Sequence, residues 1–173
     1  VTSHAPGLFE RLCLQRNFGI TGPESVDCCG GNAKMSEFQA ALGLCNLRHI
    51  DEEIRRRKAV SDRYRSWLSE SPRISLLPVQ QDVRSNYAYF PVFYRAGRDA
   101  RDAIHQEMRR QGVNCRKYFY PLTNSFACYA GYFDPDQTPV ARTLADQVLC
   151  LPIYPDLPFE DVDRICSVAR EVK

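Results

Sequence analysis

The chain has 173 residues, 44% of them hydrophobic and 25% charged, which is enough apolar material for one sizeable buried core. Lysine and arginine total 23 against 21 acidic residues, so the net charge of +2 gives no reason to expect a nucleic-acid partner. No apolar run reaches the roughly 18 residues of a membrane span, so we expect no membrane partner.

The first expected element is a short amphipathic helix over residues 8–16, with Leu8, Phe9 and Leu12 directed inward. Residues 21–24, Thr-Gly-Pro-Glu, then form a turn. Both precede a pair of glycines that opens the most informative stretch of the chain.

That stretch is residues 30–44, Gly-Gly-Asn-Ala-Lys-Met-Ser-Glu-Phe-Gln-Ala-Ala-Leu-Gly-Leu. Ser36 followed by Gln39 predicts a capping box, so a helix should begin near Ser36. The first turn of such a helix favours an anion. Asn32 could add a hydrogen bond and Lys34 a positive charge, so the corner is a candidate phosphate-binding site. The spacing differs from that of a P-loop, and from the local pattern alone a tight turn before a buried helix is favoured over a phosphate site.

The helix that begins at Ser36 is expected to run unbroken to about Ser69. Its first half should be buried nearly all round, because apolar residues cover most of its circumference: Phe38, Ala40, Ala41, Leu42, Leu44, Cys45 and Leu47. Its second half is amphipathic, with apolar residues at a spacing of three to four. We expect this helix to bridge two parts of the molecule.

A run of charges occupies residues 51–58, Asp-Glu-Glu-Ile-Arg-Arg-Arg-Lys. It suggests a nucleic-acid contact, but each acid stands four residues before an arginine, in the order that stabilises a helix. No aromatic residue interrupts the run to offer a stacking surface for bases. We therefore interpret it as a solvated helix face.

The remaining elements predict a small α+β domain with a mostly antiparallel sheet. Two strands are expected first, then a helix closed by a glycine, then a third strand and two further helices. The expected ranges are 74–77 and 87–94 (strands), 98–111 (helix), 113–118 (strand), 138–148 (helix), 151–158 (a proline-rich crossing) and 159–172 (helix).

Eight cysteines are present, but no Cys-x-x-Cys pair occurs among them, so we expect no zinc site and no other metal site. Cys45, Cys150 and Cys166 stand among apolar neighbours, where cysteine behaves as a small hydrophobic residue. A disulfide scaffold is not expected in a chain with so many other core residues. Free thiols favour a reducing, cytoplasmic location.

Five motifs, in order, resemble those of the DegT/DnrJ/EryC1/StrS family of pyridoxal-phosphate (PLP) aminotransferases, which act mainly on nucleotide-linked keto-sugars. They are Arg-Asn-Phe-Gly at 16–19, the glycine stretch at 30–44, Ser-Asn-Tyr-Ala-Tyr-Phe-Pro at 85–91, Gly-Val-Asn-Cys-Arg-Lys-Tyr-Phe-Tyr-Pro-Leu at 112–122, and Leu-Pro-Ile-Tyr-Pro at 151–155. The resemblance runs from about the first ten residues to the end of the chain.

The resemblance implies the C-terminal portion of a fold-type I aminotransferase. Residues 1–35 would be a remnant of the large PLP-binding domain, 36–70 a long bridging and dimer helix, and 71–173 the small α+β domain. Val-Thr-Ser at 1–3 resembles the strand end that follows the cofactor lysine, so the first half of the enzyme would be missing. None of the four lysines stands in that lysine motif, and we expect no transamination by this chain alone.

On the cofactor side, the family's asparagine at the position of Asn32 reaches the PLP phosphate of the other subunit. The resemblance makes Asn32 and Lys34 the cofactor-binding candidates, with Lys34 standing where the family commonly has arginine. Gly31 and Ala33 replace tyrosines, which should open the sugar end of the pocket, and Phe18 replaces a histidine, which removes a polar contact.

On the substrate side, the candidates are Arg116, Tyr118 and Tyr120. From the residues alone, this segment is equally well an ordinary strand edge. The family places it over the sugar nucleotide, which implies that Arg116 meets a diphosphate and that Tyr120 hydrogen-bonds or stacks on the sugar.

The resemblance thus predicts part of a homodimeric PLP enzyme that moves an amino group from a donor such as glutamate to a nucleotide-linked keto-sugar. The wording of its motifs is most similar to the branch that makes 4-amino-4,6-dideoxyglucose nucleotides. The alternative is a non-catalytic binding, dimerisation or regulatory module of the same fold, with which the changes at Phe18, Gly31 and Ala33 are compatible.

Overall fold

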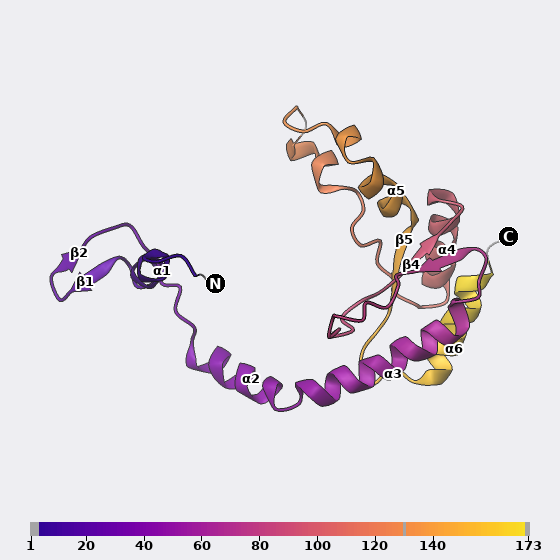
Figure 1. Ribbon diagram of the computed structural model, residues 1–173, viewed down its shortest axis with the longest axis horizontal. Helices are drawn as coiled ribbons and strands as arrows, with labels where there is room; N and C mark the ends of the chain where they lie inside the picture. The colour runs from indigo at the N-terminus through magenta and orange to yellow at the C-terminus, as the bar shows by residue number, and fades with distance from the viewer. Residues whose placement is uncertain (1–3, 130, 172–173) are drawn as a thin grey trace. The chain divides into compact units, whose positions relative to one another are not determined.

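The computed structural model describes residues 4–129 and 131–171 and divides into two compact units, Val1–His49 and Ile50–Lys173 (Figure 1). The strand end expected at residues 1–3 and the end of the last expected helix, Val172, lie outside the described residues. The division into 1–35, 36–70 and 71–173 stays a prediction.

The first unit holds two helices and a small antiparallel hairpin. Its elements are α1 (Leu8–Gln15), β1 (Ile20–Gly22), β2 (Ser25–Val26) and α2 (Glu37–Leu47). The expected helix over 8–16 is confirmed as α1, but Leu8 and Phe9 are exposed instead of directed inward, and no residue of α1 is buried. The capping box is also confirmed, because Ser36 Oγ accepts from the Gln39 amide while Gln39 Oε1 accepts from the Ser36 amide.

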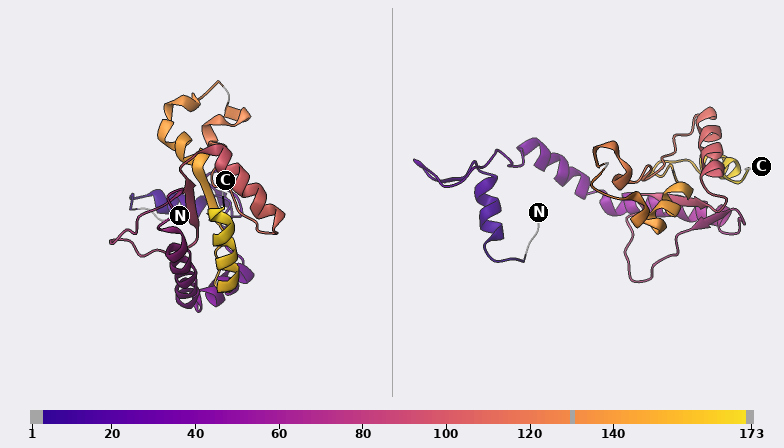
Figure 2. Two further views of the ribbon diagram at one scale, coloured as in Figure 1. Left: turned by 90° about the vertical axis from the view of Figure 1, so that its right-hand side faces the viewer. Right: turned by 90° about the horizontal axis from the view of Figure 1, so that it is seen from above.

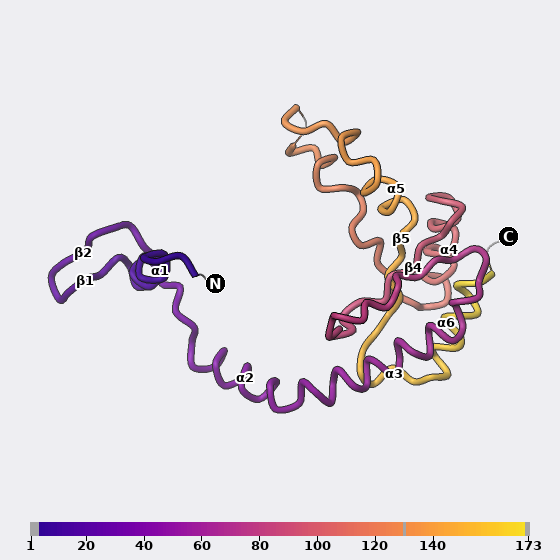
Figure 3. Tube along the Cα trace, in the orientation of Figure 1, coloured from indigo at the N-terminus to yellow at the C-terminus, as the bar shows by residue number. Residues whose placement is uncertain are grey.

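The single long helix expected from Ser36 is wrong. The chain turns after α2, and a second helix, α3 (Ile50–Leu68), begins beyond the turn, as the trace in Figure 3 shows. The amides of Arg48 and His49 donate to carbonyls three residues back, which is the spacing of a turn. No glycine or proline marks this break, so the sequence pattern did not reveal it.

The expected burial of the first half of that helix is also wrong for this chain. No residue of α2 is buried, and Phe38 is 90% exposed. Cys45, expected among apolar neighbours, is exposed as well. The apolar side chains of α2 are therefore not covered by any described residue of their own unit.

The second unit is a three-stranded antiparallel sheet with helices around it, so the expected α+β class is confirmed. The strand order is β3 (Ile74–Leu76), β4 (Phe90–Tyr94), β5 (Val148–Leu151). Besides α3, its helices are α4 (Arg98–Arg110), α5 (Pro139–Gln147) and α6 (Phe159–Arg170), with short 3-10 turns at Thr123–Ser125, Ala127–Tyr129 and Pro135–Gln137. Helix α6 lies alongside α3 and also contacts α4 (Figure 2).

The third strand is not where it was expected. Residues 113–118 form no strand, and only Arg116 pairs with the sheet, through an isolated bridge to Cys150. The third strand is β5, whose four apolar residues are all buried. β5 follows α5 with no turn residue between them. From the sequence alone, its short apolar run is therefore equally compatible with the end of a helix.

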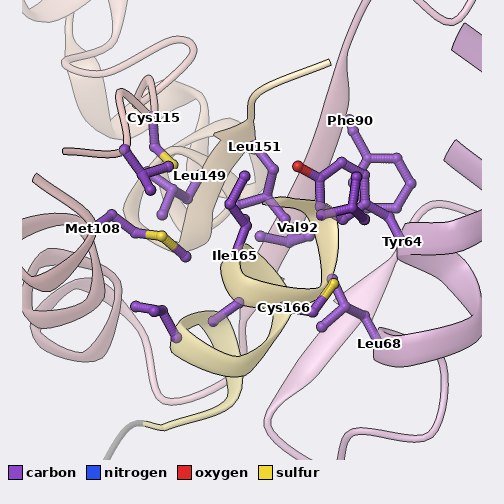
Figure 4. Close-up of a cluster of buried hydrophobic side chains, with 14 of the residues drawn as sticks. Tyr64, Leu68, Phe90, Val92, Met108, Cys115, Leu149, Leu151, Ile165 and Cys166 are labelled. Carbon is purple, nitrogen blue, oxygen red and sulfur yellow. The ribbon is translucent and has the colours of Figure 1, made fainter. Parts of the chain in front are cut away.

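The core of this unit lies between the sheet, α3, α4 and α6 (Figure 4). Tyr64 of α3 is fully buried, stacks on Phe90 at 4.8 Å between ring centroids, and donates its hydroxyl to the Pro152 carbonyl at 2.9 Å. Burial raises the pKa of Tyr64 well above its usual value. Because a buried hydroxyl without a partner is costly, this bond matters to the packing of α3 against the loop after β5.

The charged run 51–58 lies on an exposed helix face, but the expected ion pairs four residues apart are wrong. Arg55 pairs with Glu52, three residues back, at 2.6 Å. Asp51 pairs with Arg84 and Arg56 with Asp156, so neighbouring segments supply the nearer partners.

All eight cysteines lie among the described residues and are free thiols; Cys115, Cys150 and Cys166 are buried. Burial raises the pKa of Cys166 to about 12 and that of Cys150 to about 11, so both stay protonated at neutral pH. Within the described residues, no cluster of three metal-ligating side chains occurs, and no helix is both long and apolar enough to span a membrane.

Candidate functional site

The glycine corner of the first unit is built by close backbone packing. A Cβ at Gly30 would lie 2.5 Å from the Gln15 carbonyl oxygen, so only glycine fits there. Gly31 has open space around it instead. Backbone hydrogen bonds join the two sides of the corner: Phe18 N to Gly31 O (3.2 Å), Gly31 N to Gln15 O (2.9 Å) and Ala33 N to Arg16 O (3.0 Å).

Asn32 and Lys34 both stand on this corner and are exposed. Lys34 Nζ donates to Asn17 Oδ1 at 2.9 Å and lies 5.2 Å from the centre of the Phe18 ring. Because both partners are uncharged, they do not neutralise the ammonium, and its charge is available to attract an anion. The side chain of Asn32 has no hydrogen-bond partner within residues 4–129 and 131–171, which leaves its amide free to bind a ligand.

The start of α2 is a weaker anion site than the sequence suggests. The capping box occupies the amides of Ser36 and Gln39, which leaves those of Glu37 and Phe38 for a ligand. The carboxylate of Glu37 stands in the same turn and opposes an anion. The donors of this corner are therefore Asn32 and Lys34 first, and the helix end second.

In the second unit, Arg116 and Tyr118 lie at the edge of the sheet. The Arg116 backbone exchanges two hydrogen bonds with Cys150 of β5, and its guanidinium lies 5.8 Å from the Tyr118 ring. Tyr118 is half-buried against a small cluster that includes Phe93, and its ring centre is 5.3 Å from that of Tyr89. The arrangement presents an exposed cation beside aromatic faces.

Tyr120 is surrounded by cations. Its ring centre lies 4.5 Å from the guanidinium carbon of Arg101, 5.2 Å from that of Arg98 and 5.9 Å from Lys117 Nζ. Its amide donates to the Lys117 carbonyl at 2.9 Å, which closes a turn between the two residues.

Arg101 is fully buried, which is rare for a charged residue. Its Nη1 donates to the Ala145 carbonyl at 3.0 Å, and its Nε lies 2.6 Å from Asp102 Oδ1. Lys117 Nζ approaches the same oxygen to 2.5 Å. Burial by itself raises the pKa of Asp102. The adjoining Lys117 and Arg101 together lower it by more, so its pKa lies below the usual carboxyl value.

The structure thus places Asn32 and Lys34 on one corner of the first unit. In the second unit it brings Arg116 beside Tyr118, whereas Tyr120 lies against Arg101. Sequence reasoning missed Arg101 and Asp102. Arg101 stands three residues before Ile104 and seven before Met108, both buried, and this helical spacing marks position 101 as inward-facing. An arginine at an inward position was the available signal.

Comparisons with known proteins extend the picture. Residues 1–170 match the DegT/DnrJ/EryC1/StrS aminotransferase family. The chain is 40% identical to the dTDP-4-amino-4,6-dideoxy-D-glucose transaminase of Escherichia coli over 91% of its own length and 43% of that protein's. It is 30% identical to the dTDP-3-amino-3,4,6-trideoxy-alpha-D-glucose transaminase of Streptomyces venezuelae over 99% of its own length and 44% of that protein's.

Solved structures agree in fold. DesV of Streptomyces venezuelae superposes with a TM-score of 0.86 at 30% identity, over 98% of this chain and 45% of that one. The PLP form of Spr1654 from Streptococcus pneumoniae gives 0.84 at 24% identity, over 94% of this chain and 42% of that one. The chain spans less than half the length of each of these relatives. Because the family match covers nearly all of its residues, the chain belongs to the DegT/DnrJ/EryC1/StrS aminotransferase family.

Proposed function

We propose that this chain is the C-terminal portion of a PLP-dependent aminotransferase that converts a nucleotide-linked keto-sugar into an amino-sugar of the 4-amino-4,6-dideoxyglucose type. The observation that carries the proposal is the 40% identity to a transaminase of that name across 91% of the chain. The product would feed surface-polysaccharide or secondary-metabolite synthesis. A cytoplasmic location is proposed with it, supported by the eight free thiols.

The residues of the glycine corner fit a phosphate. The free amide of Asn32 and the Lys34 ammonium, held between two uncharged partners, form a donor set that an anion would complete. PLP, when bound, would supply the electron sink that amino-group transfer requires. In this proposal Asn32 and Lys34 hold the phosphate of a cofactor bound mainly by the partner subunit.

The segment around Tyr118 fits the substrate. Arg116 is exposed, so its guanidinium is available to pair with a diphosphate in two parallel hydrogen bonds. One face of Tyr120 is covered by Arg101, so we propose that Tyr120 contacts the sugar through its hydroxyl. Tyr118 would offer its ring as a wall.

The proposed assembly is a homodimer, and the proposed amino donor is glutamate or a similar amino acid. The exposed apolar side chains of α2 support a dimer contact, because a surface of this kind is normally covered by a partner. We also propose that the cofactor lysine lies outside this chain, so that residues 1–173 by themselves do not transaminate.

The test is the visible absorption spectrum of the full-length protein that carries this chain, before and after borohydride. A band that borohydride fixes covalently onto one lysine outside residues 1–173 would support the proposal. No band in the presence of added PLP would overturn it. The non-catalytic binding or regulatory module would then be the better description.

A further inference from the structure

The buried guanidinium of Arg101 needs an explanation. Moving a charge out of water is costly unless other groups replace the water. The Ala145 carbonyl accepts from Nη1, and Asp102 Oδ1 faces Nε as an ion pair, but neither Nε nor Nη2 has a hydrogen-bond partner among the described residues. The remaining contact is the ring of Tyr120, 4.5 Å from the guanidinium carbon, which attracts a cation to its face.

Asp102 faces the same segment from the next position of α4. Its Oδ1 contacts Lys117 Nζ at 2.5 Å and Arg101 Nε at 2.6 Å, so one carboxylate joins α4 to the start of the turn that Tyr120 closes. Its side chain is 30% exposed and that of Lys117 25% exposed, so water screens this pair less than a surface pair.

We propose that Arg101 and Asp102 are positioning residues that fix the segment 117–120 on α4 and thereby hold Tyr118 and Tyr120 in place for the substrate. The guanidinium of Arg101 packs on the Tyr120 ring, and the carboxylate of Asp102 holds the Lys117 ammonium by an ion pair. That Tyr118 and Tyr120 are held for the substrate rests on the proposed function of the segment. That Arg101 and Asp102 fix the segment on α4 does not depend on it.

The test uses Asp102→Asn and Lys117→Gln in the full-length protein. Lys117→Gln removes the ammonium that pairs with Asp102. Asp102→Asn removes the same pair and also the carboxylate charge that faces Arg101 and Arg98. The control is Glu107→Gln on the same helix, which removes the ion pair with Arg110, whose side chain is 74% exposed, and weakens the hydrogen bond that Glu107 accepts from Gln111. Amide hydrogen exchange of residues 116–122 is measured first, because it reports the anchoring without any substrate.

We expect exchange in this segment to accelerate about tenfold in either variant, as for loss of a partly buried ion pair. The double variant should exchange no faster than Asp102→Asn, because the contact with Lys117 is already lost in that variant. Unchanged exchange would overturn the proposal. Equal acceleration throughout β4 and α6 would also overturn it, since Asp102 would then be a general stability residue. The Glu107→Gln control should leave exchange unchanged.

The kinetic readout separates this inference from the proposed function. The KM for the keto-sugar should rise about tenfold in Asp102→Asn, while the half-reaction with the amino donor keeps its rate. Faster exchange with an unchanged KM would support the anchoring and overturn the substrate role of the segment instead. A slower donor half-reaction would count against positioning, because that step does not use the segment in this proposal.

Discussion

At the scale of single residues, Gly30 is the position where the backbone tolerates no side chain. We expect Gly30→Ala to destabilise the glycine corner by about 1–3 kcal/mol, because the new Cβ would meet the Gln15 carbonyl at 2.5 Å. Gly31→Ala is the matched control, since its Cβ would meet nothing within 4 Å. Thermal unfolding of the two variants of the full-length protein measures the difference. Equal melting temperatures would show that the corner can open without cost.

Asn32 differs from Gly30 in having no structural task for its side chain. We therefore expect Asn32→Ala to leave stability nearly unchanged and to weaken PLP binding about tenfold, which is the effect of one hydrogen bond to a charged group. Equilibrium titration of the full-length apoprotein with PLP measures it. Asn46→Ala, on an exposed position of α2, is the control. An unchanged affinity would remove Asn32 from the cofactor site.

At the scale of elements, the capping box makes a further prediction. Replacing Ser36 by alanine removes the side-chain acceptor of the Gln39 amide and should cost about 1 kcal/mol of helix stability. Amide hydrogen exchange in the first turn of α2 measures how far this turn frays. Ser66→Ala serves as control, because Ser66 bonds back to the Arg63 carbonyl within α3 and caps nothing. Equal fraying in both variants would contradict the prediction.

The helices whose ends carry chemical signals were predicted well from the sequence. Ser36 marks the start of α2. Gly112 follows the end of α4 with a φ of +75°, a left-handed conformation that glycine adopts easily and that stops a helix. The break between α2 and α3 carries no such signal, because ordinary residues at 48 and 49 form the turn. Hydrogen-bond spacing alone distinguishes it from a continuous helix.

The strands were predicted less well, since their limits depend on partners that are distant in sequence. The strand expected over 87–94 begins only at Phe90, because Tyr87 has a left-handed φ of +50° instead of an extended backbone. β5 was not predicted: residues 138–148 were expected to be a helix and 151–158 a crossing, and its pairing with β4 is what makes it a strand. Local propensity does not contain that pairing.

For the candidate site, residue types and spacing pointed to Asn32 and Lys34, whereas Arg116, Tyr118 and Tyr120 came from the family resemblance. All five stay proposals. Neither source was enough to identify what lies beneath Tyr120. The ion pair between Asp102 and Lys117 joins residues from different segments, and the burial of Arg101 depends on α5 and on the Tyr120 ring. Such support comes from tertiary packing and becomes visible only in the folded structure.

At the scale of the whole molecule, the exposed surface of α2 decides how this chain behaves by itself. Phe38 and Leu42 stand four residues apart on one face of α2, and each is more than 60% exposed. Removing a phenylalanine side chain from water is worth about 1.5–3 kcal/mol, so this face favours association. We expect residues 1–173, expressed alone, to form dimers or larger species in sedimentation velocity.

Phe38→Lys tests which surface is responsible. It places a charge at the centre of the face and should shift the population toward monomer by about tenfold in dissociation constant, or more. Val140→Lys is the control, because Val140 is 73% exposed on α5 and belongs to the other unit. A clean monomer of the unaltered chain would contradict the prediction. An equal effect of both substitutions would locate the association elsewhere, and the dimer role of α2 in the full-length enzyme would lose its support.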